Sequence, residues 1–194
     1  MKYFKKLIGE RIYLSPMCID DAEKYVDWFC DFKTTDGVGK SGGILSIESE
    51  KEWINKTLLN NEFIFSIVNI ENDELIGNCG INQIDQKNRA AEIGIFIGNE
   101  KDRNKGYGKE ALNILLDYGF NYLNLNNIQL GVFSFNERAI ACYKKVGFKE
   151  YGRRRKCYFL NGKYYDKVYM DILAEEFKGN YIKNKNIWKN TATI

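Results

Sequence analysis

The turn from Arg103 to Gly108, Arg-Asn-Lys-Gly-Tyr-Gly, holds the residues best suited to chemistry. It stands between an alternating strand pattern and an amphipathic helix pattern, so it would bring free backbone N–H groups and the positive end of a helix dipole to one point. Its glycines allow a ligand to approach the backbone closely. Arg103, Lys105 and Lys109 add positive charge, and an arginine can grip a phosphate through two parallel hydrogen bonds. The turn is therefore predicted to bind phosphate.

Two common phosphate loops do not match this turn. The dinucleotide fingerprint needs a third glycine, but position 111 is Ala111, which only its looser form allows, and residues 126–134 contain no acidic side chain to bind a ribose. A Walker loop needs Ser or Thr after Gly-Lys, and Glu110 follows Gly108-Lys109 here. Taken alone, the turn is explained equally well as a glycine connection with solvated lysines.

A second segment, Asn136 to Phe148, follows about thirty residues later. Asn136 is a natural helix N-cap, and Gly147-Phe148 is a natural helix end. Arg-x-x-Gly-x-Gly opening a helix, followed by Asn136 and by Tyr143-x-x-x-Gly-Phe, resembles the GNAT superfamily of N-acetyltransferases over nearly all of residues 8–174. The closing hairpin, Arg155 to Tyr169, resembles the ribosomal-protein-alanine N-acetyltransferase (RimJ/RimL-like) branch, which also contains some polyamine acetyltransferases.

The resemblance implies acetyl-CoA as cosubstrate and no metal. The backbone of one strand would bind the pantetheine amides, the turn would hold the pyrophosphate, and two residues of the second segment would face the coenzyme. The implied cofactor-binding residues are Ile95, Phe96, Ile97, Arg103, Asn104, Lys105, Gly106, Tyr107, Gly108, Lys109, Asn136 and Tyr143.

Acetyl transfer to an amine requires a proton acceptor and a proton donor, and the resemblance implies Tyr143 as the acid toward the leaving thiolate. Glu92 precedes the cofactor strand and could take the amine proton directly or through water. A buried aromatic role for Tyr143, and an ion pair between Glu92 and Arg89, are the structural alternatives. Cys142 suggests an acyl-cysteine route, but no neighbouring residue in the sequence would activate it.

Composition excludes several other classes of site. The chain of 194 residues has no histidine, which removes Ser-His and Cys-His catalysis and most zinc sites. Its five cysteines lack pairing or regular spacing. No membrane span or signal peptide is evident, so we expect a soluble cytoplasmic protein. The basic C-terminal third could contact nucleic acid, which we do not favour, because Arg153 to Lys156 also suits a strand near an anionic cofactor.

Periodicity predicts an α/β (α+β) fold, a mixed and mostly antiparallel sheet of about seven strands flanked by about four helices. Strands are expected at 11–17, 63–70, 75–84, 92–97, 127–134, 148–159 and 164–173, and helices at 21–29, 48–59, 106–122 and 136–146. Residues 33–46 are expected to be a glycine-rich loop. Residues 1–174 form the predicted acetyltransferase domain, and residues 175–194 a basic tail in which Trp188 could dock.

The predicted function is acetyl-CoA-dependent N-acetylation of a primary amine, on a protein N-terminus, a polyamine or another small amine, by direct attack in a ternary complex. A catalytically silent acyl-CoA-binding module is the alternative. Carboxylates crowd residues 20–52 and hint at a cationic acceptor, although first-turn carboxylates on two helices explain them as well. The acceptor, the oligomeric state, with a homodimer as one option, and the general base, Glu92 or a water chain, stay open.

Overall fold

One mixed sheet organises the chain in this computed structural model, which describes residues 2–184. Its eight strands run in the order β1-β2-β3-β4-β5-β6-β8-β7, and every adjacent pair is antiparallel except β5 with β6. The strands are β1 (Leu7–Ile8), β2 (Ile12–Pro16), β3 (Phe63–Asn69), β4 (Leu75–Asp85), β5 (Ala90–Ile97), β6 (Asn127–Phe133), β7 (Lys149–Leu160) and β8 (Lys163–Leu173). The helices are α1 (Ala22–Cys30), α2 (Phe32–Val38), α3 (Ile47–Leu59), α4 (Tyr107–Asn121) and α5 (Glu137–Val146), with short 3-10 turns at Ile19–Asp21, Glu100–Asp102 and Ala174–Glu176.

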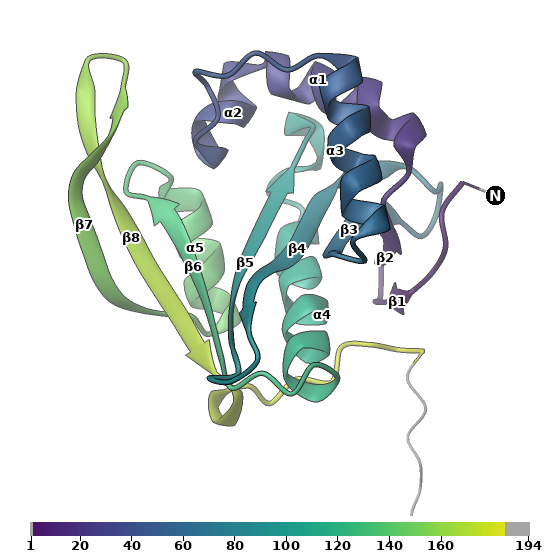
Figure 1. Ribbon diagram of the computed structural model, residues 1–194. Coiled ribbons are helices and arrows are strands. Elements are labelled where there is room, and N and C mark those ends of the chain that lie inside the picture. The colour runs from purple at the N-terminus through teal and green to yellow at the C-terminus, as the bar shows by residue number, and fades with distance from the viewer. Residues whose placement is uncertain (1, 185–194) are drawn as a thin grey trace, which may run out of the picture.

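The alternation of each central strand sends its apolar residues to one face. Ile93 of β5, Leu130 of β6 and Met170 of β8 lie in the core that α4 and α5 cover. The intervening residues face the other side, which we call the front. There α1 and α3 cover β2 to β5, and Phe96 packs edge-on against Trp28. In Figure 1 no helix crosses the front of β8 and β7, and their hairpin rises beyond the rest of the sheet.

The strands β5 and β6 separate partway along their length. Their parallel register covers only Ala90 to Glu92 of β5, and beyond Glu92 the two strands diverge, as Figure 1 shows. β4 stays paired with β5 through Ile97. From Ile93 to Ile97, β5 therefore presents a backbone edge that β6 does not pair. Gly94 pairs regularly with Gly80, and the register shift between β4 and β5 lies between Asn82 and Asp85 of β4.

The expected loop at residues 33–46 is wrong in its first half, where α2 forms. Asp31 caps this helix by accepting a hydrogen bond from the Lys33 N–H, and Gly39 ends it in the left-handed conformation at φ 73°. With α2 and the short edge strand β1, the molecule has five α-helices and eight strands among its described residues, one more of each than expected. The mixed, mostly antiparallel α/β fold is confirmed.

Part of the predicted tail lies against the body of the molecule. The backbone N–H groups of Tyr181 and Ile182 donate to the buried Asp117 carboxylate of α4, at 2.6 and 3.0 Å. The Lys183 N–H donates to the Ile8 carbonyl of β1 at 2.7 Å. Ile182 is itself buried. The predicted docking residue Trp188 lies outside the described residues, and the boundary at residue 174 stays a prediction.

Candidate active site

A cleft of about 630 Å³ occupies the gap between β5 and β6. It is bounded by the turn before α4, by the first turns of α4 and α5, and by α2. Nearly all the predicted site residues line it, namely Glu92, Ile95, Phe96, Ile97, Arg103, Asn104, Gly106, Tyr107, Gly108, Lys109, Asn136 and Tyr143. Lys105 does not line the cleft. Its carbonyl instead accepts a hydrogen bond from Arg11 Nη1 at 2.9 Å.

The turn before α4 exposes backbone donors to the cleft. Asn104 and Gly106 adopt positive φ angles of 62° and 86°, which these two residue types tolerate best. α4 then begins at Tyr107, and the Glu110 N–H makes the first helical bond, to the Gly106 carbonyl. The N–H groups of Tyr107, Gly108 and Lys109 have no hydrogen-bond partner among residues 2–184. They form an open helix start, which is the geometry on which the prediction of phosphate binding rests.

The side chain of Arg103 is engaged differently from the predicted two-pronged grip on phosphate. Its Nε donates to the Ile97 carbonyl at 3.2 Å, and its Nη2 donates to the Gly98 carbonyl at 2.8 Å and to the Thr34 hydroxyl at 2.6 Å. This edge of the guanidinium therefore ties the end of β5 to α2. Only Nη1 is left to face an anion.

Asn136 has the N-cap role predicted for it. Its Oδ1 accepts a hydrogen bond from the Ala139 N–H at 3.2 Å, a contact that typically stabilises a helix by about 1 kcal/mol. Its Nδ2 lies near Gly37 of α2, because a Cβ added at Gly37 would be 3.2 Å from that nitrogen. Asn136 thus caps the start of α5 and lies beside α2.

Tyr143 is half-buried on α5 and lines the cleft. Its ring packs at 66° against Phe148, with 6.0 Å between the centroids. Burial raises the pKa of its phenol well above the usual value of 10.0, so the hydroxyl is protonated at neutral pH. Within the described part of the chain, that hydroxyl has no hydrogen-bond partner. A protonated donor is therefore available inside the cleft.

Glu92 lies at the point where β5 and β6 separate. It pairs in register with Asn82 of β4 and Gln129 of β6, and its half-buried side chain lines the cleft. The alternative ion pair with Arg89 does not form. Arg89 instead donates to the carbonyl and the side-chain oxygen of Asn124, at 2.7 and 2.8 Å. The Glu92 carboxylate is thus placed to take a proton from a molecule in the cleft.

Cations outnumber carboxylates around the cleft. Its charged lining residues are Lys33, Glu92, Asp102, Arg103, Lys109, Arg138, Lys145 and Lys167. The carboxylates of residues 20–52, read as a hint of a cationic acceptor, are not among them. Cys142 also lines the cleft, but burial raises the pKa of its thiol despite nearby Lys109, Lys145 and Arg138. An acyl-cysteine route gains no support from this environment.

Sequence reasoning missed several cleft residues because they come from other segments. Thr34 and Gly37 belong to α2, which was expected to be loop, and Gly131, Phe133 and Lys167 lie on β6 and β8. The capping pair Asp31 and Gly39 was a sequence signal for α2. No local signal marks Lys167, because only the pairing of β6 with β8 brings it to the cleft.

Among the described residues, none of the helices is both long and apolar enough to cross a bilayer. The same part of the chain has no cluster of three or more cysteine, aspartate and glutamate side chains suited to a metal ion.

Comparison with known proteins places this architecture in a family. The family model described as the acetyltransferase (GNAT) domain matches residues 17–169. The chain is 32% identical to an uncharacterized N-acetyltransferase, p20, of Bacillus licheniformis, over 89% of this chain and 98% of that protein. It is 33% identical to the spermidine N(1)-acetyltransferase of Vibrio cholerae, over 68% of this chain and 76% of that one.

A solved structure shares the fold. The spermidine N-acetyltransferase of Vibrio cholerae, solved in complex with CoA and spermine, superposes with a TM-score of 0.78 at 28% identity, covering 86% of this chain and 97% of that chain. The cleft, its helix start and its protonated tyrosine thus occur in an acetyltransferase framework. The chain belongs to the GNAT family of N-acetyltransferases and is an acyltransferase enzyme.

Proposed function

We propose that the protein transfers the acetyl group of acetyl-CoA to a primary amine by direct attack in a ternary complex. The observation that carries this proposal is the convergence of three features in one cleft. These are the unpaired edge of β5, the open N-terminus of α4, and the pair of Glu92 and Tyr143.

The residues of the cleft fit acetyl-CoA. The unpaired backbone of Ile95 offers hydrogen bonds to the amides of an extended chain, as an added strand would. The Phe96 carbonyl instead points toward Gly77 of β4. The Ile97 carbonyl is less available, because Arg103 already donates to it. The N–H groups of Tyr107, Gly108 and Lys109 suit a pyrophosphate. The Lys109 side chain and Arg103 Nη1 add charge, and Asn104 and Gly106 shape the turn.

When bound, acetyl-CoA supplies a thioester whose C–S bond breaks as the amine nitrogen forms its bond to the acetyl carbon. Glu92 accepts the proton that the amine loses, directly or through a water molecule. Tyr143, whose phenol is protonated at neutral pH, gives its proton to the departing sulfur. The chain itself thus supplies one acceptor and one donor of protons, and neither is a histidine.

The similarity to the spermidine acetyltransferase of Vibrio cholerae supports an amine as the acceptor of the acetyl group. A polyamine, a protein N-terminus as in the RimJ/RimL-like branch, and other small amines are the candidate acceptors. A homodimer and a cytoplasmic location stay predictions.

The proposal is tested by release of the CoA thiol from acetyl-CoA, with the acetylated product identified by mass spectrometry. The panel contains polyamines, amino acids and peptides with free N-termini. Amine-dependent release that yields an N-acetyl product supports the proposal. Tight binding of acetyl-CoA without release to any of these amines contradicts it.

A further inference from the structure

Lys167 of β8 is the cleft residue whose chemistry the proposed mechanism does not use. It pairs in register with Phe133, yet its side chain runs back over Gly131 on the neighbouring strand. A Cβ added at Gly131 would lie 2.1 Å from Lys167 Cε and 2.9 Å from Nζ. The absence of a side chain at Gly131 therefore makes room for the lysine. Its ammonium is 5.4 Å from the centroid of the Tyr169 ring.

The Lys167 ammonium has no ion pair within residues 2–184. Neighbouring carboxylates on its own strand are engaged elsewhere. Asp166 accepts a hydrogen bond from the Lys156 N–H at 2.9 Å, and Asp171 accepts one from Asn127 at 2.9 Å. Glu92 shares the cleft but lies beyond ion-pair distance. A half-buried ammonium with three donor protons is thus left for a ligand.

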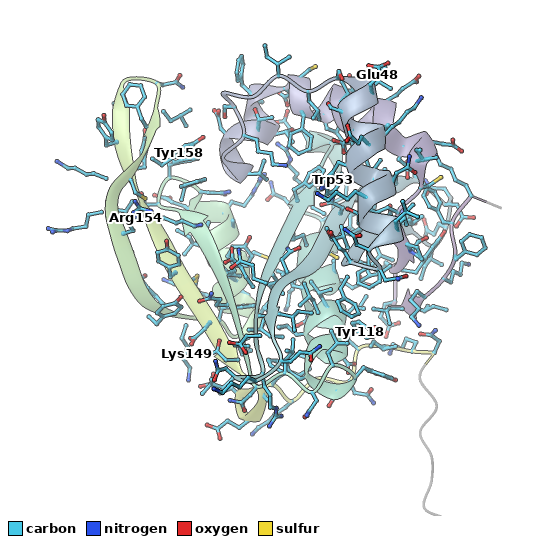
Figure 2. The ribbon with its side chains drawn as sticks, in the orientation of Figure 1. Glu48, Trp53, Tyr118, Lys149, Arg154 and Tyr158 are labelled. Carbon is cyan, nitrogen blue, oxygen red and sulfur yellow. The ribbon has the colours of Figure 1, made fainter. Side chains whose placement is uncertain are left out.

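The position of Lys167 sets it apart from the phosphate-binding turn. Gly131 follows Gln129 on β6, and Gln129 is the register partner of Glu92. Lys167 therefore lies on the front of the sheet, across the gap between β5 and β6 from Glu92. Aromatic rings wall this end of the cleft, since Phe133 stacks on Tyr158 with 4.0 Å between centroids. Figure 2 shows Tyr158 on this side, toward α2.

We propose that Lys167 forms a subsite for an oxyanion on the acceptor, so that the enzyme acetylates small amines that also carry a carboxylate or a phosphate group. This inference rests on the proposed function. Glu92 would face the amino group, while Lys167 binds the oxyanion a few bonds away. A carboxylate and an ammonium on opposite sides of one cleft complement such an acceptor.

The same geometry disfavours a diamine or polyamine as the acceptor. Such a molecule brings a second ammonium and no oxygen acceptor, so Lys167 would repel it. The acidic groups that would attract a polycation, Asp20 to Glu52, lie outside the cleft lining. This chain would therefore differ in acceptor from its spermidine-acetylating relative.

The test compares matched acceptors that share a three-carbon chain. β-Alanine carries a carboxylate, 3-aminopropanamide carries its neutral amide, and 1,3-diaminopropane carries a second amine. Glycine, 4-aminobutanoate and 2-aminoethyl phosphate extend the series in length and separate carboxylate from phosphate. We expect kcat/KM for the best oxyanion acceptor to exceed that for the diamine by roughly tenfold or more.

Two variants remove the subsite in different ways. Lys167→Met removes the charge, and Gly131→Ala keeps the charge but displaces the lysine. Both should lower kcat/KM for the oxyanion acceptors roughly tenfold and leave that for the diamine equal or higher. Lys163→Met, at the exposed hairpin turn, is the matched control and should change nothing.

The outcomes separate this inference from the proposed function. If no acceptor releases CoA although acetyl-CoA binds, the proposed function fails. A second outcome is that the diamine is acetylated as fast as β-alanine and its homologues, with a rate that Lys167→Met does not change. That result contradicts only the oxyanion subsite. An increase in the KM for acetyl-CoA, equal for all acceptors, would assign Lys167 to the coenzyme instead and would also overturn it.

Discussion

The two sides of the cleft are built in opposite ways. The turn side comes from one continuous segment, from Ile93 in β5 to Lys109, and its useful groups are mainly backbone. The front side is assembled from separate strands, with Gly131 from β6 and Lys167 from β8, and its useful groups are side chains. The backbone of a glycine turn suits a ligand common to a whole family, whereas single side chains on separate strands can change from one member to the next.

The largest expected effect concerns Tyr143, which should serve both sides. Tyr143→Phe removes the phenolic proton, so kcat should fall by on the order of 100-fold or more for every acceptor. Acetyl-CoA affinity should stay within about twofold, because no bond to the coenzyme is lost on the turn side. Steady-state kinetics and calorimetry measure the two quantities.

Tyr118→Phe is the matched control for Tyr143→Phe. Tyr118 lies on α4, where Figure 2 labels it. Its ring packs against Phe65, and it does not line the cleft. The Tyr118→Phe variant should therefore have the turnover of the unaltered enzyme. Equal turnover in the Tyr143→Phe enzyme and the unaltered enzyme would remove the acid role.

Glu92→Gln changes a side chain on the front side of the cleft and leaves the backbone groups of the turn side in place. Loss of the proton acceptor should lower kcat roughly 10- to 100-fold at neutral pH. The loss should shrink as pH rises, because hydroxide can then increasingly take the proton that the amine loses on attack. A pH profile of kcat checks this expectation, with Glu48→Gln on α3, away from the cleft, as control. A deficit that is constant across pH would show that Glu92 positions groups and takes no proton.

A smaller effect is expected from Gly108→Ala, confined to the turn side. The added Cβ would meet protein atoms only at ordinary contact distances, the nearest being Ile97 Cγ1 at 3.8 Å. Thermal stability should therefore stay equal or rise slightly. The Kd for CoA should increase roughly tenfold, because the methyl occupies space that the pyrophosphate needs. Gly42→Ala, where the added Cβ meets nothing within 4 Å, is the control.

Gly106→Ala tests backbone strain in the same turn, for comparison with the blocked coenzyme binding expected of Gly108→Ala. Gly106 has φ 86°, so an alanine there is strained and should lower the free energy of unfolding by roughly 1 kcal/mol or more. Denaturant titration of both variants distinguishes strain from blocked binding. An unchanged Kd in the Gly108→Ala enzyme would mean that the coenzyme does not approach this backbone closely.

The contrast between the sides also explains what could be predicted from sequence. Local signals located the turn at Gly106, the cap at Asn136 and the closing hairpin within Arg155 to Tyr169, since each depends on neighbouring residues. Long-range pairing decides the rest. Lys167 reaches the cleft only because β8 inserts between β6 and β7.

Two side chains show how alternative partners limit prediction from sequence. Asp21 stands at the cap position of α1, but its buried carboxylate accepts from the Tyr3 hydroxyl at 2.8 Å and makes no cap bond. Arg103 was expected to bind phosphate, yet α2 supplies Thr34 as a partner. An amino-acid type indicates which bonds a residue can make, while the packed neighbours decide which ones form.

The hydrogen bond from Lys183 to Ile8 joins two segments that are synthesised at very different times. Synthesis runs from the N-terminus, so β1 is made long before the segment that pairs with its outer edge. Until residues 181–184 arrive, that edge offers unpaired backbone groups to other chains. A chain shortened before residue 181 would keep its catalytic cleft but carry an open sheet edge, and its solubility would suffer before its activity did.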